Sequence, residues 1–500
     1  MSRPILVLDG RNFQSGISML GAHAERGGIF FKAAGVTPLF DAGSALSVNN
    51  GFLMAGAAGT AATYGSVTGN IIKMIPDGGV YYSGGLGLIG VTDDNEIVKI
   101  ALADGIPSGS LSAVNTTTPA MTPGLVVFGI SGAQTLIYRQ ISQIGKYVSS
   151  TYTDNYITSG INTDYFGAMH VHYGLNKIIY GNGPGKLGTI DSVGTSVTAA
   201  LAFDTNSYCS ALSDDGIYVI AALTRNSSAD ATLFNESKII FWDGSRTTGF
   251  LRDFTITDPI IYSIQKTPIG IFAFGNTGIW QVTFDGVKKI FNHNPGVYLV
   301  TATAGIHYGN GATSFFSDAL IWGGQVGSST ARAVKSLGKL DSAALGAYLN
   351  PILGTASKNI TALSGQLSKG YVFIADDTPQ LKYYPIGSGT PQTGVTAQTV
   401  YFSVPKPLNI ERVDVIFGEP LASGDTLDLD VYRDEDTSAV SFGDVSYTAQ
   451  KATRRHSFRN TSSTGGITSN LEVYQKFSLL LTFTAGTPKV ARIEVFGSAI

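Results

Sequence analysis

Two histidines, His170 and His172, are the residues whose type and spacing most directly suggest chemistry. Side chains two positions apart on a strand point to the same side, so both imidazoles would share one face of the run 169–173. Two imidazoles on one face can begin a metal site. The sequence nearby offers no HExxH-type carboxylate and no third ligand, and His293 and His307 are far away along the chain. Paired histidines at the surface or between blades are therefore favoured, and we assign no metal ligand.

Carboxylates gather at four places along the chain. A calcium loop needs several oxygen ligands at intervals of two with a glycine at the sharp bend, and none of the four has that pattern. We expect each group to cap a hairpin instead. The four groups are 93–96, Asp214 with Asp215, Asp376 with Asp377, and 433–436.

Enzyme motifs are not found in a usable context. The run Ser213-Asp214-Asp215-Gly216 is similar to the Asp-box turn of sialidase propellers, but the Thr and Trp that complete that motif are missing, and no arginine triad can be assembled. Phosphate-binding loops and the GxSxG elbow both need a strand-to-helix turn, whereas Gly387-Ser388-Gly389 lies in a linker. We predict no catalytic residue, no cofactor-binding residue and no enzymatic activity.

A single cysteine, Cys209, leaves no intrachain disulfide framework and no zinc site built from several cysteines. Its run 208–212 is typical of a buried strand, so we expect a small buried side chain. The one basic cluster is interpreted as a solvated turn between strands in preference to a phosphate site. Its members are Arg454, Arg455, His456 and Arg459.

The elements that would position these residues are short strands. Apolar hairpins recur with centres roughly 40 to 50 residues apart, which is the period of a four-stranded propeller blade. We therefore predict an all-β chain with a multi-bladed β-propeller of about seven blades. The hairpins are expected at 79–102, 125–141, 177–190, 217–242, 269–290, 314–322 and 371–384.

Turn chemistry supports these hairpins, because Asp followed by Gly adopts the left-handed angles of two-residue hairpin loops. Asp215-Gly216, Asp243-Gly244 and Asp285-Gly286 carry this signal. The runs 217–221 and 269–274 are almost continuously apolar, which indicates inner strands covered on both faces.

Composition shifts along the chain predict three regions. Residues 1–45 are interpreted as an extended arm with first strands, 46–390 as the propeller, and 396–500 as an antiparallel β-sandwich. Apolar residues at three- and four-residue spacing predict one short helical insertion at 341–353. In the last region, 425–433 alternates apolar and polar residues, as a strand with one wet face does.

Bulk composition excludes several classes of function. Only 14% of the 500 residues are charged, 61 are Gly, and the formal net charge is −3 with a pI near 6.1. No basic stripe suggests nucleic-acid binding, and no apolar run approaches the roughly 20 residues that span a bilayer. The N-terminal apolar stretch is too short for a signal peptide, so we expect synthesis in the cytosol without export.

The order of these regions resembles the propeller-bearing nozzle or hub proteins in the tails of short-tailed bacteriophages. The likeness rests on the Gly-rich arm 12–28, the degenerate propeller and the final strand 492–497, and it covers most of the chain by architecture, without a diagnostic motif. It implies a non-enzymatic virion structural protein assembled in the host cytoplasm. It also implies a homo-oligomeric ring, possibly six-fold, that contacts other tail proteins and lets DNA pass without sequence-specific binding.

Two other classes of function stay open. A glycan- or receptor-binding module on a phage tail or cell surface could stack sugars on exposed aromatics, although strand packing is the favoured interpretation of these residues. A hydrolase with its site in the propeller channel is the other. The aromatic candidates are Tyr81, Tyr82, Tyr383 and Tyr384.

Overall fold

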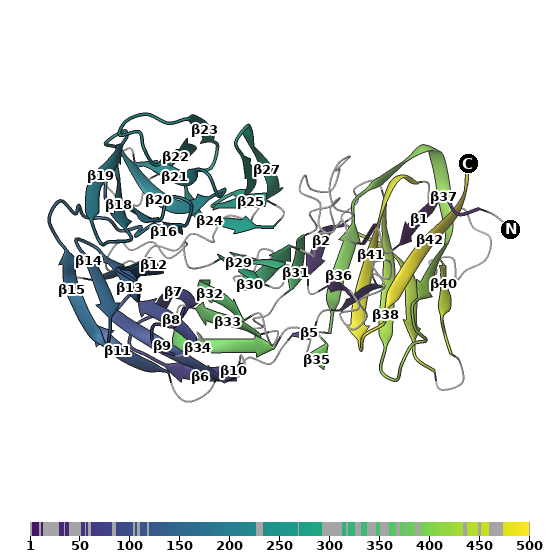
Figure 1. Ribbon diagram of the computed structural model, residues 1–500. Helices are drawn as coiled ribbons and strands as arrows, with labels where there is room; N and C mark the ends of the chain where they lie inside the picture. Colours follow the sequence, from purple (N-terminus) through teal and green to yellow (C-terminus); the bar gives the residue numbers. More distant parts are fainter. Residues whose placement is uncertain are drawn as a thin grey trace. The chain divides into compact units, whose positions relative to one another are not determined.

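Strands make up every named element of the described chain (Figure 1). The structure is a computed structural model that describes residues 3–9, 12–13, 30–34, 36–39, 52–55, 57–58, 62–82, 87–103, 106–107, 111–117, 120–226, 234–268, 270–292, 313–316, 319–325, 332–337, 347–350, 360–366, 371–376, 378–385, 390–391, 393–433, 438–448, 452–459 and 474–499. The predicted all-β class is confirmed for these residues.

Two compact units divide the chain. The multi-sheet unit comprises Ala61–Arg332 and Thr355–Ile386. The large-sheet unit comprises Met1–Thr60, Ala333–Gly354 and Gly387–Ile500.

Small antiparallel sheets follow one another along the chain, and in the described residues six have four strands and one has five. The first contains β7 (Ile71–Pro76), β8 (Gly87–Thr92), β9 (Glu96–Ala103), β10 (Ile106–Pro107) and β11 (Ser112–Thr116). The second and third contain β12 (Met121–Ile130), β13 (Ala133–Gln140), β14 (Ile144–Val148) and β15 (Thr151–Ile157), then β16 (Met169–His172), β17 (Lys177–Gly181), β18 (Lys186–Asp191) and β19 (Ser196–Ala202).

The fourth and fifth sheets contain β20 (Ser207–Asp214), β21 (Val219–Asn226), β22 (Phe234–Trp242) and β23 (Arg252–Ile256), then β24 (Ile261–Thr267), β25 (Gly270–Gly275), β26 (Gly278–Thr283) and β27 (Gly286–Asn292). The sixth contains β28 (Thr313–Phe316), β29 (Ala319–Gln325), β30 (Arg332–Leu337) and β31 (Ala347–Asn350). Of these strands, β31 and all of β30 after Arg332 fall within the residues Ala333–Gly354 of the large-sheet unit. The last contains β32 (Ile360–Gln366), β33 (Tyr371–Asp376), β34 (Thr378–Pro385) and β6 (Ala62–Ser66).

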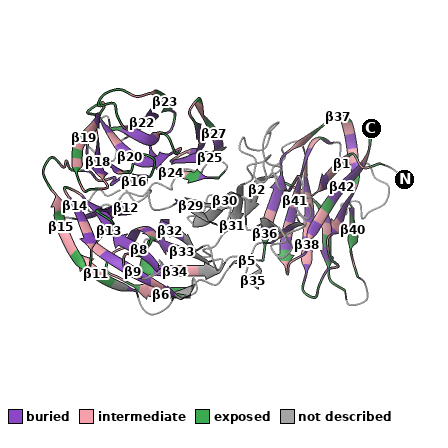
Figure 2. Ribbon diagram, in the orientation of Figure 1, coloured by how far each residue is buried: buried purple, intermediate pink, exposed green. Residues whose placement is uncertain are grey.

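The first strands of these sheets contact one another in cyclic order. β7 contacts β12, and the contacts continue through β16, β20, β24, β28 and β32, which returns to β7. Apolar clusters fill the space between consecutive sheets from the first to the fifth, and a further cluster joins Ile71 and Leu88 of the first sheet to Ala362 and Phe373 of the last. Burial on both faces explains why all six positions of β8 are buried (Figure 2).

Buried hydroxyl groups connect neighbouring first strands at three of these junctions. Ser210 Oγ of β20 donates to the Ile261 carbonyl of β24 at 2.5 Å, and Ser263 of β24 shares a 2.5 Å hydrogen bond with Thr313 of β28. Thr361 Oγ1 of β32 donates to the Ile71 carbonyl of β7 at 2.6 Å. These bonds satisfy polar groups that would otherwise be buried without partners, and the last connects the final sheet to the first.

All seven predicted hairpins are confirmed, one in each small sheet. The pairs are β8 with β9, β12 with β13, β17 with β18, β21 with β22, β25 with β26, β28 with β29 and β33 with β34.

The Asp-Gly turns agree with the predictions only in part. Gly216, at φ of +100°, lies between β20 and β21, but Asp214 pairs with Val219, so the loop is longer than two residues. Asp285-Gly286 marks a two-residue hairpin loop as predicted, but the loop is Phe284-Asp285, because Gly286 pairs with Thr283 and belongs to β27. The pairing partner, and not the dipeptide, sets where each turn lies.

Asp243-Gly244 also departs from the predicted two-residue loop. It follows β22, and the next strand, β23, begins only at Arg252. A tight loop elsewhere gave no such signal: Val148 pairs with Thr151, and Ser149 and Ser150 both have positive φ, +51° and +65°. Serine accepts these angles at some cost, which the flanking strand pairing offsets.

The last small sheet takes its outer strand from the other end of the unit. β6 pairs antiparallel with β34, with Leu381 opposite Gly65 and Tyr383 opposite Ala62. Together with the contact between β32 and β7, this pairing joins the N-terminal and C-terminal segments of the multi-sheet unit. No local pattern in the sequence indicated it.

The large-sheet unit is built on one sheet of eleven strands. The strands are β1 (Leu6–Asp9), β2 (Phe30–Ala34), β3 (Val36–Leu39), β4 (Phe52–Ala55), β36 (Val395–Thr399), β37 (Phe402–Phe417), β38 (Thr426–Arg433), β39 (Val440–Ser446), β40 (Arg455–Arg459), β41 (Tyr474–Ala485) and β42 (Val490–Ala499). The short strands β5 (Ala57–Ala58) and β35 (Thr390–Pro391) pair separately. β1 pairs with β42 and β2 with β36, so strands from the region interpreted as an extended arm lie in this sheet.

Strand β38 shows the predicted alternation. Leu427, Leu429 and Val431 are fully buried, while the residues between them are half-buried. The alternation places the apolar side chains on the covered face of the sheet.

The predicted helix at 341–353 is wrong over Ala347–Asn350, which form strand β31. Ser336 and Tyr348 lie opposite each other in antiparallel pairing with β30. Apolar residues in so short a segment fit a period of two as well as a helical period, and the available strand partner decides between them. The other residues of the predicted helix lie outside the described part.

Candidate functional site

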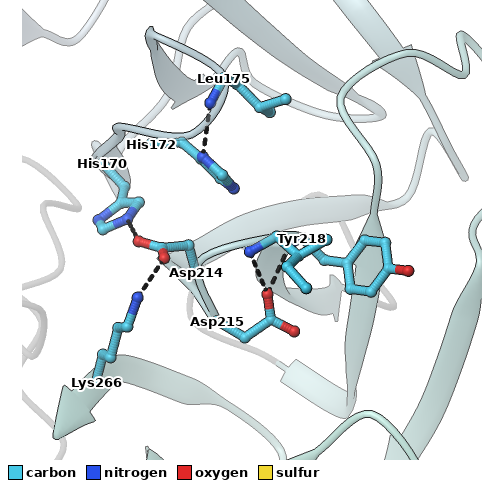
Figure 3. A network of polar contacts seen from close by, with 8 residues as sticks. His170, His172, Leu175, Asp214, Asp215, Tyr218 and Lys266 are labelled. Carbon is cyan, nitrogen blue, oxygen red and sulfur yellow. Dashed lines mark hydrogen bonds and ion pairs between the residues drawn. The ribbon is translucent and has the colours of Figure 1, made fainter. Parts of the chain in front are cut away.

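His170, Asp214 and Lys266 form one polar network across three consecutive sheets (Figure 3). His170 lies on β16, Asp214 ends β20 and Lys266 lies on β24, so all three come from first strands. His170 Nε2 is 2.6 Å from Asp214 Oδ2, and Lys266 Nζ donates to Asp214 Oδ1 at 2.6 Å. One carboxylate therefore connects the third sheet to the fifth through the fourth.

The Asp214 carboxylate is stabilised in its charged form. Burial opposes ionisation of this side chain, but the hydrogen bonds and positive charge of His170 and Lys266 outweigh burial and hold the pKa of the carboxyl well below its usual range. The Asp214 side chain is only 11% exposed, compared with 26% for His170 and 47% for Lys266. The two basic groups thus lie on the solvent side of a shielded anion.

His172 does not join His170 in a common site. His172 is buried, and its Nδ1 accepts a hydrogen bond from the Leu175 amide at 3.1 Å (Figure 3). This hydrogen bond holds the imidazole against the turn that follows β16. Among the described residues, no group of three or more His, Cys, Asp or Glu side chains is placed to hold a metal ion. His293 and His307 lie outside those residues.

The network of His170, Asp214 and Lys266 can hold three sheets together. Its geometry leaves little room for catalytic proton transfer. Each Asp214 oxygen already accepts a strong, charge-assisted hydrogen bond. A His-Asp pair can orient an imidazole for proton transfer, but here the carboxylate is shared with a lysine. His170 and Asp214 stand out in the sequence separately and Lys266 does not, because partners 44 and 52 residues away leave no local signal.

Of the other acidic groups, Asp215 caps its own hairpin turn as predicted, whereas the described contacts of Asp93 and Asn95 go to other segments. Asp93 Oδ1 accepts from the Asn70 amide at 2.6 Å, and Asn95 Oδ1 accepts from the Met121 amide at 3.2 Å. Asp215 Oδ1 accepts from two amides of its own turn at 2.8 and 2.6 Å. The Asp215 oxygen satisfies backbone donors in its own turn, whereas the oxygens of Asp93 and Asn95 connect the turn after β8 to the start of β7 and to the start of β12.

The two remaining acidic groups are described only in part. Asp376 is buried, and Lys382 Nζ lies 2.7 Å from its Oδ2. Asp377 and residues 434–437 lie outside the described part. The Asp376 contact is thus an ion pair within the hairpin of β33 and β34.

Cys209 is fully buried on β20, as predicted, and burial raises the pKa of its thiol well above the usual value. A thiol with a raised pKa is a weak nucleophile at neutral pH.

The basic cluster was wrongly interpreted as a turn, because Arg455, His456 and Arg459 lie on strand β40, which pairs with β37. Arg455 donates to Asp414 from Nε at 3.1 Å and from Nη2 at 2.5 Å, and also to Glu494 at 3.1 Å. This guanidinium therefore serves neighbouring carboxylates within the large sheet.

The aromatic candidates for sugar stacking take part in internal packing where their side chains are described. Tyr81 stacks on Tyr147 with ring centroids 4.6 Å apart, and its hydroxyl forms a hydrogen bond with Tyr152. Tyr383 packs against Phe373, and Tyr82 is half-buried. The side chain of Tyr384 lies outside the described part.

Comparisons with known proteins assign no family. No protein-family model matches the chain, and no curated protein matches it. Among solved structures, Raptor of Chaetomium thermophilum is similar at a TM-score of 0.45 and 11% identity, over 67% of this chain and 30% of that one. The computationally designed protein Ika8 is similar at a TM-score of 0.37 and 13% identity, over 65% of this chain and 99% of the design.

The chain thus spans less than a third of the Raptor chain. In the part of the chain that the structure describes, no helix is both long and apolar enough to cross a membrane.

Proposed function

We propose that the seven small sheets form a seven-bladed β-propeller, that the large sheet folds as a β-sandwich, and that the chain is a non-enzymatic structural component of a bacteriophage tail. The cyclic contacts between first strands, together with the apolar cluster between the first and last small sheets, support the propeller.

The observation that carries the structural role is the use of the polar residues. The groups with the chemistry of a site have partners inside the chain: Asp214 binds His170 and Lys266, and Arg455 binds Asp414. Such contacts fix neighbouring strands and sheets relative to one another. A protein whose work is shape and contact needs this rigidity.

As a tail component, the chain would assemble into a ring, possibly six-fold, in the host cytoplasm, contact other tail proteins and let DNA pass. The formal net charge of −3 suits a surface that does not retain DNA, because like charges repel.

The mass and symmetry of the purified native protein test this proposal. Light scattering should give several copies per particle, and negatively stained particles should show a ring. Particles of one chain at every concentration would contradict it.

A further inference from the structure

We draw no further inference here: the strongest candidate, the patch of exposed apolar side chains that Tyr173, Val193 and Ile217 form at the hairpin tips of the third and fourth sheets, is an unpartnered apolar face, and nothing in the described residues shows what covers it.

Discussion

The two units use a shielded carboxylate in different ways. Asp214 of the multi-sheet unit takes its partners from the neighbouring sheets, through β16 and β24. Asp414 of the large-sheet unit takes Arg455 from β40, the strand paired with its own. The first arrangement fixes sheets relative to each other, and the second fixes strand register within one sheet.

The environment of each carboxylate follows from this difference. The Asp414 side chain is 2% exposed, and Arg412 Nε lies 3.0 Å from Oδ1 without hydrogen-bond geometry, so Arg412 supplies charge more than a directed bond. The Asp214 side chain is 11% exposed at the edge of the small sheets. A repeat of small sheets can keep its ion network near solvent, whereas the large sheet buries its carboxylate between strands.

Asp414→Ala should have the largest effect. The substitution removes two charge-assisted hydrogen bonds from Arg455, whose side chain is 52% exposed, so we expect a loss of about 2 to 3 kcal/mol in the free energy of unfolding of the large-sheet unit. All three tryptophans, Trp242, Trp280 and Trp322, lie in the multi-sheet unit. Circular dichroism should therefore show that the large-sheet unit unfolds at a lower denaturant concentration than in the wild type. The midpoint measured by tryptophan fluorescence, which reports the multi-sheet unit, should not change. A shift of the fluorescence midpoint would contradict the view that the Asp414 ion pairs stabilise the large-sheet unit independently of the multi-sheet unit.

Asp214→Asn should have the next largest effect on the free energy of unfolding, and this effect should appear in the multi-sheet unit. Loss of the carboxylate charge weakens two charge-assisted bonds at a partly shielded site, and we expect about 1 to 2 kcal/mol. The tryptophan-fluorescence midpoint should fall. Asp204→Asn is the matched control, because Asp204 is 49% exposed and 3.7 Å from Arg225. If both variants lower the fluorescence midpoint equally, the Asp214 network contributes no more than the exposed pair of Asp204 and Arg225.

Acid should remove the Asp214 contribution only at low pH. The folded pKa of this carboxyl is depressed, so its contribution to stability is complete above the unfolded value of about 3.9 and is lost as pH falls toward the lower folded value. The stability difference between the wild type and Asp214→Asn should therefore shrink as the pH falls below about 4. Fluorescence-monitored urea titrations at each pH measure it. A difference that grows as the pH falls below about 4 would refute the assigned sign.

Lys266→Ala should have the smallest effect. Lys266 is 47% exposed, and solvent and salt screen its attraction to Asp214, so we expect less than about 1 kcal/mol. The loss should decrease further in 1 M NaCl. A double-mutant cycle of Lys266→Ala with His170→Ala measures whether the two bases act through the same carboxylate. Purely additive losses would show that they do not.

Local sequence determined the kind of element and much of its position. Each predicted hairpin occurs in its own small sheet, and the alternation in β38 placed Leu427, Leu429 and Val431 in the core. Apolar periodicity carries such information because burial on one or both faces of a strand follows from neighbouring residues alone. The same locality misassigned 347–350 as helix, where a strand partner was needed to decide.

Tertiary structure decided which distant residues meet. β6 completes the sheet of β32 to β34, and β1 joins β42, although each pair is separated by most of its unit. Asp214 meets Lys266 only because β20 and β24 lie side by side. Hydrogen-bonded partners and ion pairs across sheets depend on the packing order of whole sheets, and residue types along one strand do not encode that order.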